Sequence, residues 1–567
     1  MTVRLSSLGV KAVLYCSLLC CSLVCAASTS FAADDPLGFQ SEDDYELQHP
    51  PAKNYFRPLP PPVTVESSAP ASAAAQEVPA ARPPDVQTKR AMFGNKQPAS
   101  QPATQAANAP APRPEDKMLK GELSMLGMTE FLNAQNFAGV GIGYYSLDSV
   151  SYLQLFPMLD LHFLDNRLHL DLGAAVNVAI FDPNDGGFKA AGKIRKQDWD
   201  EWQDYFKILR RLQYGKKEDH FFVRLSQVGA ASLGHGGFMR RYNNNMFANS
   251  THLGLEVDAY NDYVGVEGFI SDVTFQSRVL GALAFVKPLG WMESAVARSL
   301  SIGGYYTGDL AAPTTLKRDD QGVVLTDKAD NPLYNSTGLH GVGADIEVKP
   351  IRVGDLIDVK TYVDFNQFIG LGNGFTGGVL GRFNIPIPFL AIRARAEYRN
   401  LGDQYVPSYF DNFYEIQKLQ MVTFSPSTFA PTKLEFMKSI HTGQRRSNGY
   451  FEVTFAWVDK LAITAAYDYG GGFLQQDFLL HAEFSAFDWL RLFATYHKRN
   501  FDNFNQLFKF EQNDLLYGQA RVEILPFLFL NGRVMKTFEW DPGIDLGLGG
   551  LRNAWSYQLD IELGWQW

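Results

Sequence analysis

The sequence predicts an all-β fold, a closed antiparallel β-barrel that crosses a membrane with about 16–20 strands, 18 being the best estimate. Three observations lead to this prediction. Apolar and polar residues alternate from about residue 135 onward, the alternating stretches are about ten residues long, and their connections alternate between short and long. Residues 118–567 form the predicted barrel.

The last stretch of the chain shows the alternation best. Successive residues of a strand point to opposite faces, so an alternating strand has one apolar and one polar face. The apolar set here is Tyr557, Leu559, Ile561, Leu563, Trp565 and Trp567. The same period recurs in 166–181, 252–260, 341–349, 356–366, 391–399, 450–469, 490–499 and 515–536.

A soluble β-sandwich would also show this alternation, so other features must distinguish a sandwich from a membrane barrel. The stretches are long enough to cross a bilayer as tilted strands, and many apolar faces end in an aromatic residue, as in an interfacial girdle. These aromatic residues are Tyr398, Trp457, Tyr467, Tyr469, Tyr496 and Trp565. Membrane barrels also have short turns on one side and long loops on the other, here typified by 459–460 and 401–448. We therefore expect a barrel whose apolar faces contact lipid.

The strand count is ambiguous in one region. Counting back from Trp567, short and long connections alternate consistently to about residue 250, and the pattern fails across 182–250. A tally of about 19 strands also conflicts with the even number needed when both chain ends lie on one side of the membrane. A strand has been missed in this region, or one too many counted.

The first 117 residues are expected to lie outside the barrel. Residues 1–32 have a basic start, an apolar stretch and a small-residue cleavage site, as in a signal peptide, and contain the chain's four cysteines. Residues 33–117 are rich in Pro and Ala and are predicted to be a disordered periplasmic linker. It is either a passive spacer or a tail (34–117) that docks a periplasmic protein.

Charge and composition exclude several classes of protein. The chain has 51 Lys and Arg against 61 Asp and Glu, without a basic block, so nucleic acid is not an expected partner. No later apolar run has the length of a transmembrane helix, and only helices and closed barrels satisfy their backbone hydrogen bonds in lipid.

One segment, 194–213, has helical periodicity. Trp199, Trp202, Tyr205, Phe206, Leu209 and Leu212 recur at spacings of three and four residues. We expect an α-helix in a long loop, either folded into the lumen as a constriction or packed on the outer rim.

The C-terminal pattern resembles the insertion signal of Gram-negative outer-membrane β-barrel proteins of the porin-like kind. The residues that carry it are the apolar set of the last strand, with Trp567 where Phe is commoner. The resemblance covers about residues 130–567. It implies location in the cell outer membrane after export through the inner membrane, contact with outer-membrane lipid, and recognition by the barrel-assembly machinery. It identifies no subfamily.

If lipid covers the apolar faces, the polar faces line the lumen. Charged side chains there could set ion selectivity, or they could pair across strands and fill the lumen. The candidates are Arg382, Arg393, Arg395, Arg399, Arg491, Arg521, Arg533, Asp358, Asp364, Glu523, Asp560 and Glu562.

A second candidate is the run Leu233-Gly234-His235-Gly236-Gly237 with Arg240 and Arg241, which could bind an anion or simply form a turn. No nucleophile motif, phosphate loop or His pair at metal-ligand spacing is present, so we expect no enzyme activity, cofactor or metal.

Two functions remain in competition. The first is a channel for small hydrophilic solutes. The second is a scaffold, surface adhesin or exit component of an export or envelope-spanning complex, with outer loops 310–338 and 401–448 and a docking tail at 34–117.

Overall fold

The structure is a computed structural model. It describes residues 136–567 except 148, 165–166, 201, 216–218, 246–251, 328–331, 355, 386–389, 421–431, 458–460, 471–475, 488, 502, 511–513 and 542–549. The expected signal peptide and linker lie outside the described residues.

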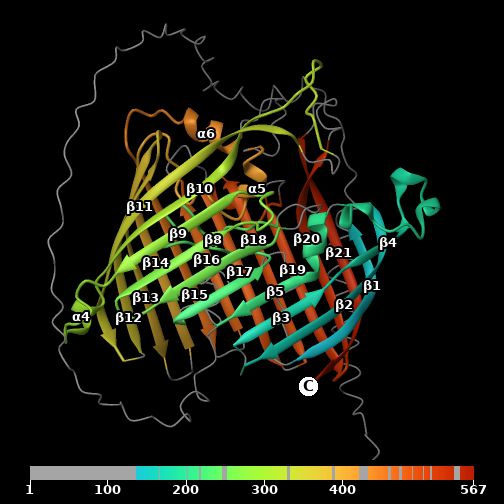
Figure 1. Ribbon diagram of the computed structural model, residues 1–567, viewed down its shortest axis with the longest axis horizontal. Helices are drawn as coiled ribbons and strands as arrows, with labels where there is room; N and C mark the ends of the chain where they lie inside the picture. Colours follow the sequence, from blue (N-terminus) through green and yellow to red (C-terminus); the bar gives the residue numbers. More distant parts are fainter. Residues whose placement is uncertain are drawn as a thin grey trace, which may run out of the picture. The chain divides into compact units, whose positions relative to one another are not determined.

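The strands form one antiparallel sheet that closes on itself (Figure 1). Neighbours in the chain pair with each other, and β1 pairs with β21 from Phe137–Gln566 to Leu147–Ser556. The strands are β1 (Phe137–Leu147), β2 (Val150–Phe163), β3 (Leu168–Gly173), β4 (Val176–Phe181), β5 (Leu209–Tyr214), β6 (Phe221–Ser226), β7 (Gly254–Tyr260), β8 (Val264–Ile270), β9 (Val279–Val286), β10 (Ser301–Leu316), β11 (Tyr334–Val353), β12 (Ile357–Phe368), β13 (Asn373–Ile385), β14 (Leu390–Leu401), β15 (Arg446–Trp457), β16 (Leu461–Tyr469), β17 (Gln476–Phe487), β18 (Leu490–Phe501), β19 (Leu515–Leu525), β20 (Leu528–Asp541) and β21 (Gly550–Gln566). The described helices are η2 (Pro183–Asp185), η3 (Phe188–Ala190), η4 (Lys196–Asp198), η5 (Trp202–Ile208), α4 (Ala295–Arg298), α5 (Tyr414–Gln417), α6 (Lys433–Ser439) and η6 (Phe504–Gln506).

The 21 segments make a 20-stranded barrel. β3 and β4 lie end to end along β2, because one part of β2 pairs with β3 and another part pairs with β4. They are two parts of one barrel strand. The predicted class and closure are confirmed, and 20 strands is the upper limit of the predicted range, whereas the best estimate of 18 is wrong. Because the number of strands is even, the first strand begins and the last strand ends at the same rim of the barrel.

The helix expected at 194–213 is not formed. This segment contains the short 3₁₀ helices η4 and η5 and then the strand β5, which pairs with β3 on one side and β6 on the other. Pairing on both edges satisfies the backbone of the last part of this segment, β5, within the sheet and so overrides the helical periodicity there. β5 also explains why the count of connections failed across 182–250. Trp202 and Tyr205 of η5 are 62% and 60% exposed, so their rings are not packed into the barrel interior.

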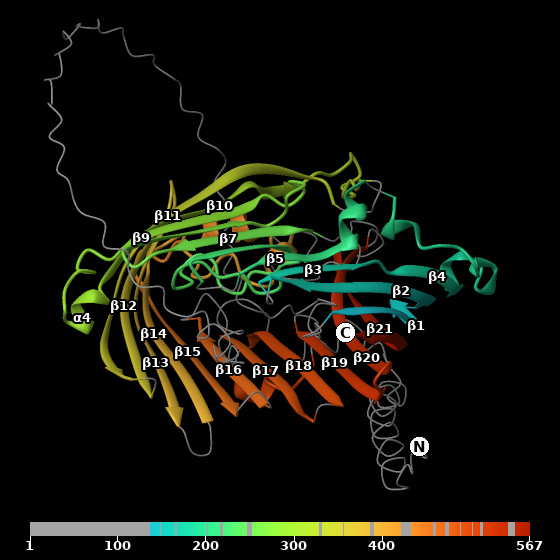
Figure 2. The same cartoon turned by 60° about the horizontal axis from the view of Figure 1, so that its bottom comes forward.

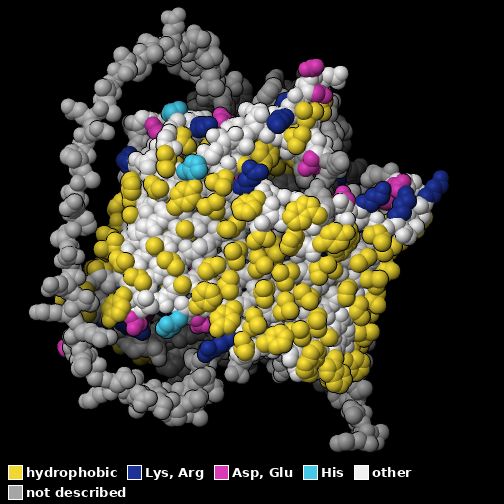
Figure 3. Space-filling view, viewed as in Figure 1, with side chains coloured by type: hydrophobic (Ala, Val, Ile, Leu, Met, Phe, Trp, Pro, Cys, Tyr) yellow, Lys and Arg dark blue, Asp and Glu magenta, His cyan; other side chains and the backbone are white. Residues whose placement is uncertain are grey.

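The two faces of the sheet differ as the alternation predicts. On β11, the outward Ile346 is 51% exposed, whereas the neighbouring Asp345 is 8% exposed. Figure 3 shows apolar side chains over the middle of the outer wall and charged side chains gathered at its two edges. Such a band matches the hydrocarbon layer of a bilayer, and only a closed sheet leaves no unpaired edge within it.

The connections divide between two rims. The C-terminal rim carries the chain end, short turns such as 526–527, and α4; the loop rim carries α5, α6 and the long connections (Figure 1). Among the described residues, no helix is long and apolar enough to span a membrane.

Candidate functional site in the barrel lumen

A segment of the chain crosses the lumen between β6 and β7. We call its described residues, 227–245 and 252–253, the crossing loop. Its side chains contact inward-facing residues of five strands. His235 lies beside Asp345 of β11, and Phe238 packs on Tyr305 of β10 and Phe368 of β12. Arg240 pairs with Glu397 of β14, and Arg241 pairs with Glu452 of β15. Only a segment inside the barrel can reach inner side chains of five strands.

A second long connection folds inward beside it. Its described residues 402–420 and 432–445, which we call the mouth loop, lie between β14 and β15 and carry α5 and α6. Figure 1 labels both helices near one end of the barrel, and Figure 2 shows the closed ring of strands. Tyr409 and Phe410 are 1% and 0% exposed. The predicted long connection exists, but these residues do not form an outer surface, because burying their aromatic rings removes a large apolar area from water.

The two loops hold each other. The amide of Arg240 donates to the Phe410 carbonyl at 3.0 Å, and the amide of Phe410 donates to the Phe238 carbonyl at 2.9 Å. Phe238, Met239 and Tyr242 of the crossing loop join Phe410 and Tyr414 of the mouth loop in a buried hydrophobic cluster. This core lies inside the barrel, a position that strand periodicity does not reveal.

Ion pairs tie the loops to the barrel wall. Arg240 lies 2.6 Å from Glu397, which also binds Arg399 at 2.7 Å, and Arg399 reaches Asp468 at 2.7 Å. Burial lowers the pKa of the Arg240 guanidinium, but the facing Glu397 carboxylate raises it further, so the pKa ends well above its usual value. The charge of Arg240 is thus held by the wall.

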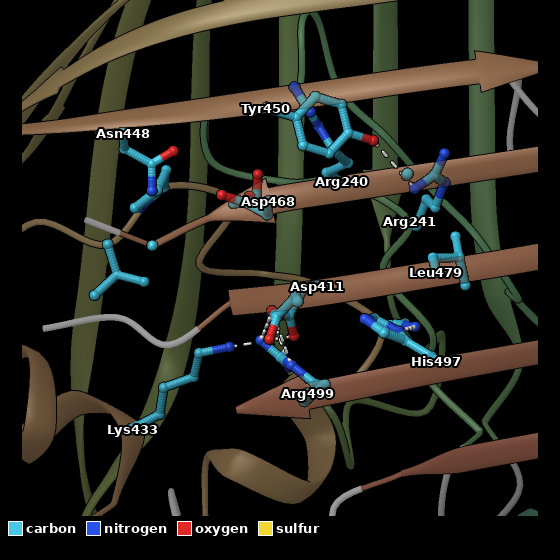
Figure 4. Close-up of a pocket in the computed structure, with 17 residues that line it drawn as sticks. Arg240, Arg241, Asp411, Lys433, Asn448, Tyr450, Asp468, Leu479, His497 and Arg499 are labelled. Atoms are coloured by element: carbon cyan, nitrogen blue, oxygen red, sulfur yellow. Dashed lines mark hydrogen bonds and ion pairs between the residues drawn. The ribbon is translucent and has the colours of Figure 1, made fainter. Parts of the chain in front are cut away.

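A second group of charges joins the mouth loop to β18. Arg499 and Lys433 lie 3.1 Å and 3.2 Å from Asp411 (Figure 4). Lys433 is 1% exposed, and this burial lowers its pKa to about 8, with Asp411 partly opposing the shift. The space left among these residues is only about 100 Å³.

A larger cavity lies between the crossing loop and the C-terminal rim. Its volume is about 750 Å³, and eight Lys or Arg against five Asp or Glu line it. The basic residues are Lys287, Arg298, Lys349, Arg352, Lys360, Arg382, Arg393 and Arg395; the acidic residues are Asp262, Glu267, Asp345, Glu347 and Asp358. The cavity is therefore a polar chamber with an excess of positive charge.

The predicted lumen residues separate into four groups. Arg382, Arg393, Arg395 and Asp358 line the large cavity, where Asp358 pairs with Lys349 at 3.0 Å. Arg399 and Asp364 are buried beside the crossing loop, at 2% and 0% exposure. Four others, Arg521, Arg533, Asp560 and Glu562, line a separate space of about 50 Å³. Neither Arg491 on β18 nor Glu523 on β19 lines any of these three spaces. The twelve residues thus form no single ring.

The residues of the predicted insertion signal lie together on the outer face of β21. Tyr557 is the least exposed, at 39%, and Trp565 the most, at 68%. The placement agrees with a lipid-facing strand, and recognition by the assembly machinery stays a prediction.

Sequence reasoning overlooked part of the site. Lys349 and Lys360 lie at polar positions of the alternating stretches, so the alternation predicts that their side chains point into the lumen. They were not among the candidates. Asp411 and Lys433 carried no periodic signal, because they belong to a loop whose position depends on the closed barrel.

Comparisons with solved structures return bacterial outer-membrane proteins. OmpT of Vibrio cholerae aligns with 9% identity and a TM-score of 0.25, covering 76% of this chain and 96% of OmpT. Wzi of Escherichia coli, described as a carbohydrate-binding β-barrel involved in capsule assembly, aligns with 10% identity and a TM-score of 0.28, covering 76% and 85%. OccK11 (OpdR) of Pseudomonas aeruginosa aligns with 10% identity and a TM-score of 0.28, covering 76% and 96%.

No protein-family model and no curated protein matches the sequence. At these identities and scores the comparisons carry no information on substrates. The closed antiparallel sheet, its apolar outer band and its polar interior define the fold as a transmembrane β-barrel.

Proposed function

We propose that this protein is an outer-membrane channel for small hydrophilic solutes, with a preference for anions. One observation carries the proposal: the cavity of about 750 Å³ inside the barrel has eight basic and five acidic lining residues. A chamber with an excess of fixed positive charge attracts anions and repels cations, most strongly at low ionic strength.

Three arginines of β13 and β14 lie together on the wall of this chamber. Arg382 and Arg393 are register partners on the two strands, and Arg395 follows on the same face of β14. Guanidinium groups present several fixed donors to carboxylate or phosphate oxygens. Solutes bearing such groups are the class that this wall suits best.

Reversal potentials in a planar bilayer test the proposal. Under a KCl gradient, we expect an anion-selective current from the purified protein and a shift toward cation selectivity in the triple variant Arg382→Gln/Arg393→Gln/Arg395→Gln. Lys189→Gln/Lys196→Gln is the matched control, because both lysines are exposed and lie between β4 and β5, away from this cavity. Cation selectivity of the unaltered protein, or an equal shift in the control, would contradict the proposal.

The inward loops favour a second candidate, a barrel without conductance that serves as a scaffold or adhesin. The crossing and mouth loops pack tightly inside, and the space among their ion pairs is only about 100 Å³. Absence of a channel current in a planar bilayer that contains correctly inserted protein would support this candidate. Deletion of 34–117 then tests the expected docking tail: loss of function with an assembled barrel would point to a periplasmic partner.

A further inference from the structure

We propose that His235, Asp345 and Glu347 bind a divalent metal ion of the Zn²⁺ or Mn²⁺ class, which would fasten the crossing loop to β11. The His235 Nε2 lies 3.0 Å from Asp345 Oδ2 and 3.4 Å from Glu347 Oε2, and the three ligand atoms all lie within 4.8 Å of one another. Ligands about 2.0–2.2 Å from a metal are themselves roughly 3–3.5 Å apart in tetrahedral or octahedral geometry. The distances from His235 Nε2 to the two carboxylate oxygens fit that requirement.

Incomplete hydrogen bonding provides an independent observation. Within the part of the chain that the structure describes, the buried Asp345 Oδ1 makes no hydrogen bond, and the buried His235 Nε2 makes none beyond its ion-pair contacts with the two carboxylates. The two residues are only 7% and 8% exposed. Buried polar atoms almost always have a partner, and an ion is one of the partners that can complete such a group. Both atoms belong to the same three-residue cluster.

The imidazole is held firmly in place. Its ring stacks on Tyr362 with centroids 3.8 Å apart and planes 5° from parallel. The His235 carbonyl accepts a hydrogen bond from Arg240 at 2.7 Å. Gly234 and Gly236 on either side have φ of +56° and +85°, which other residues rarely adopt, so the backbone at His235 requires these glycines.

The carboxylates are equally well placed. Asp345 and Glu347 stand two residues apart on β11, so both point into the lumen. Asp345 faces Gly303 of β10, where a side chain would overlap with its carboxylate. All three ligands also line the cavity of about 750 Å³, from which water can complete the coordination. One imidazole with two carboxylates is a donor set suited to Zn²⁺ or Mn²⁺.

One neighbour competes with the metal. Lys360 Nζ lies 2.7 Å from the Glu347 oxygen nearest His235. The ammonium would have to turn aside into the cavity when a cation binds. Replacing Lys360 with Met should therefore strengthen metal binding several-fold, whereas a purely structural ion pair predicts no gain.

The test uses the purified, untagged full-length protein in detergent, stripped with a chelator and titrated with Zn²⁺ by calorimetry and metal analysis. We expect one bound Zn²⁺ per chain, and affinity at least about tenfold lower in His235→Gln and in Asp345→Asn. His340→Gln is the matched control and should bind as the unaltered protein does. Mn²⁺ electron paramagnetic resonance provides a second readout.

Each outcome is decisive once heat-modifiable gel mobility shows that the variants are folded. Loss of one Zn²⁺ in both ligand variants, with a gain in Lys360→Met, supports the site. Absence of bound Zn²⁺ and Mn²⁺, or unchanged binding in the ligand variants, overturns it. Bilayer selectivity is measured separately, so failure of the metal site is distinguishable from failure of the channel.

Discussion

Removal of the Glu397 charge should release the crossing loop. The carboxylate is 1% exposed and accepts from Arg240 at 2.6 Å, from Arg399 at 2.7 Å and from the Tyr362 hydroxyl at 2.6 Å. Glu397→Gln keeps the shape of the side chain and eliminates its charge. Arg399 keeps its ion pair with Asp468 at 2.7 Å, so Arg240 is the side chain that loses its carboxylate partner.

The size of the effect follows from the burial of this pair. Arg240 is 8% exposed, and its remaining contacts include the His235 carbonyl and the ring of Tyr450, 4.0 Å from the guanidinium carbon. Removing one partner of a buried ion pair costs about 3–5 kcal/mol. Since about 1.4 kcal/mol corresponds to a factor of ten, the lower limit shifts the equilibrium of loop release more than 100-fold.

Cysteine labelling measures this release. Ala230 of the crossing loop is 5% exposed, and the four natural cysteines lie in the segment expected to be removed on export. In an Ala230→Cys background, we expect a maleimide to react about 100-fold faster when Glu397→Gln is added. More frequent transitions to a larger conductance should accompany the faster labelling.

Glu562→Gln is the matched control for this experiment. Glu562 is 5% exposed and pairs with Arg521 of β19, away from the crossing loop. It should leave the labelling of the introduced cysteine unchanged. Equal labelling rates in the Glu397→Gln variant and the unaltered background would refute the reasoning that this ion pair holds the loop.

Further predictions concern the mouth loop, a loop-rim turn and the outer wall. Burial lowers the pKa of Lys433 to about 8, from an ordinary value of 10.5, so between these pH values the unfolded chain binds more protons than the folded chain. Denaturant unfolding should therefore show the free energy of unfolding rising by about 3 kcal/mol from pH 8 to 10.5. The variant Lys433→Met should not show this rise. The pKa of Asp272 is lowered to about 2, because hydrogen bonds and the charge of His252 outweigh burial; its contribution should be lost as the pH falls from about 4 through 2, and Asp272→Asn should remove that dependence in the same assay. Phe410→Ala should cost about 3–5 kcal/mol and speed labelling in the Ala230→Cys background, while the barrel keeps its heat-modifiable mobility. Trp565→Ser/Trp567→Ser should slow insertion into vesicles, and unchanged insertion would contradict the role of the terminal strand.

Much of the wall was predictable because it depends on local alternation. Arg393 and Arg395 stand between apolar residues, and a strand must place both on the side opposite those neighbours. In the structure both line the cavity of about 750 Å³ inside the barrel. The segment 194–213 was mistaken for a helix because its apolar spacing is compatible with helical periodicity, and the partners β3 and β6 that make its last part a strand are not visible locally.

The sequence by itself determined that this chain forms a membrane barrel, since alternation, strand length and terminal aromatics act within about ten residues of chain. Only the tertiary structure decided what fills that barrel. His235 meets Asp345, and Arg240 meets Glu397, across more than a hundred residues. Such contacts arise because closing the sheet brings distant strands around one interior, where the loops must satisfy buried charges.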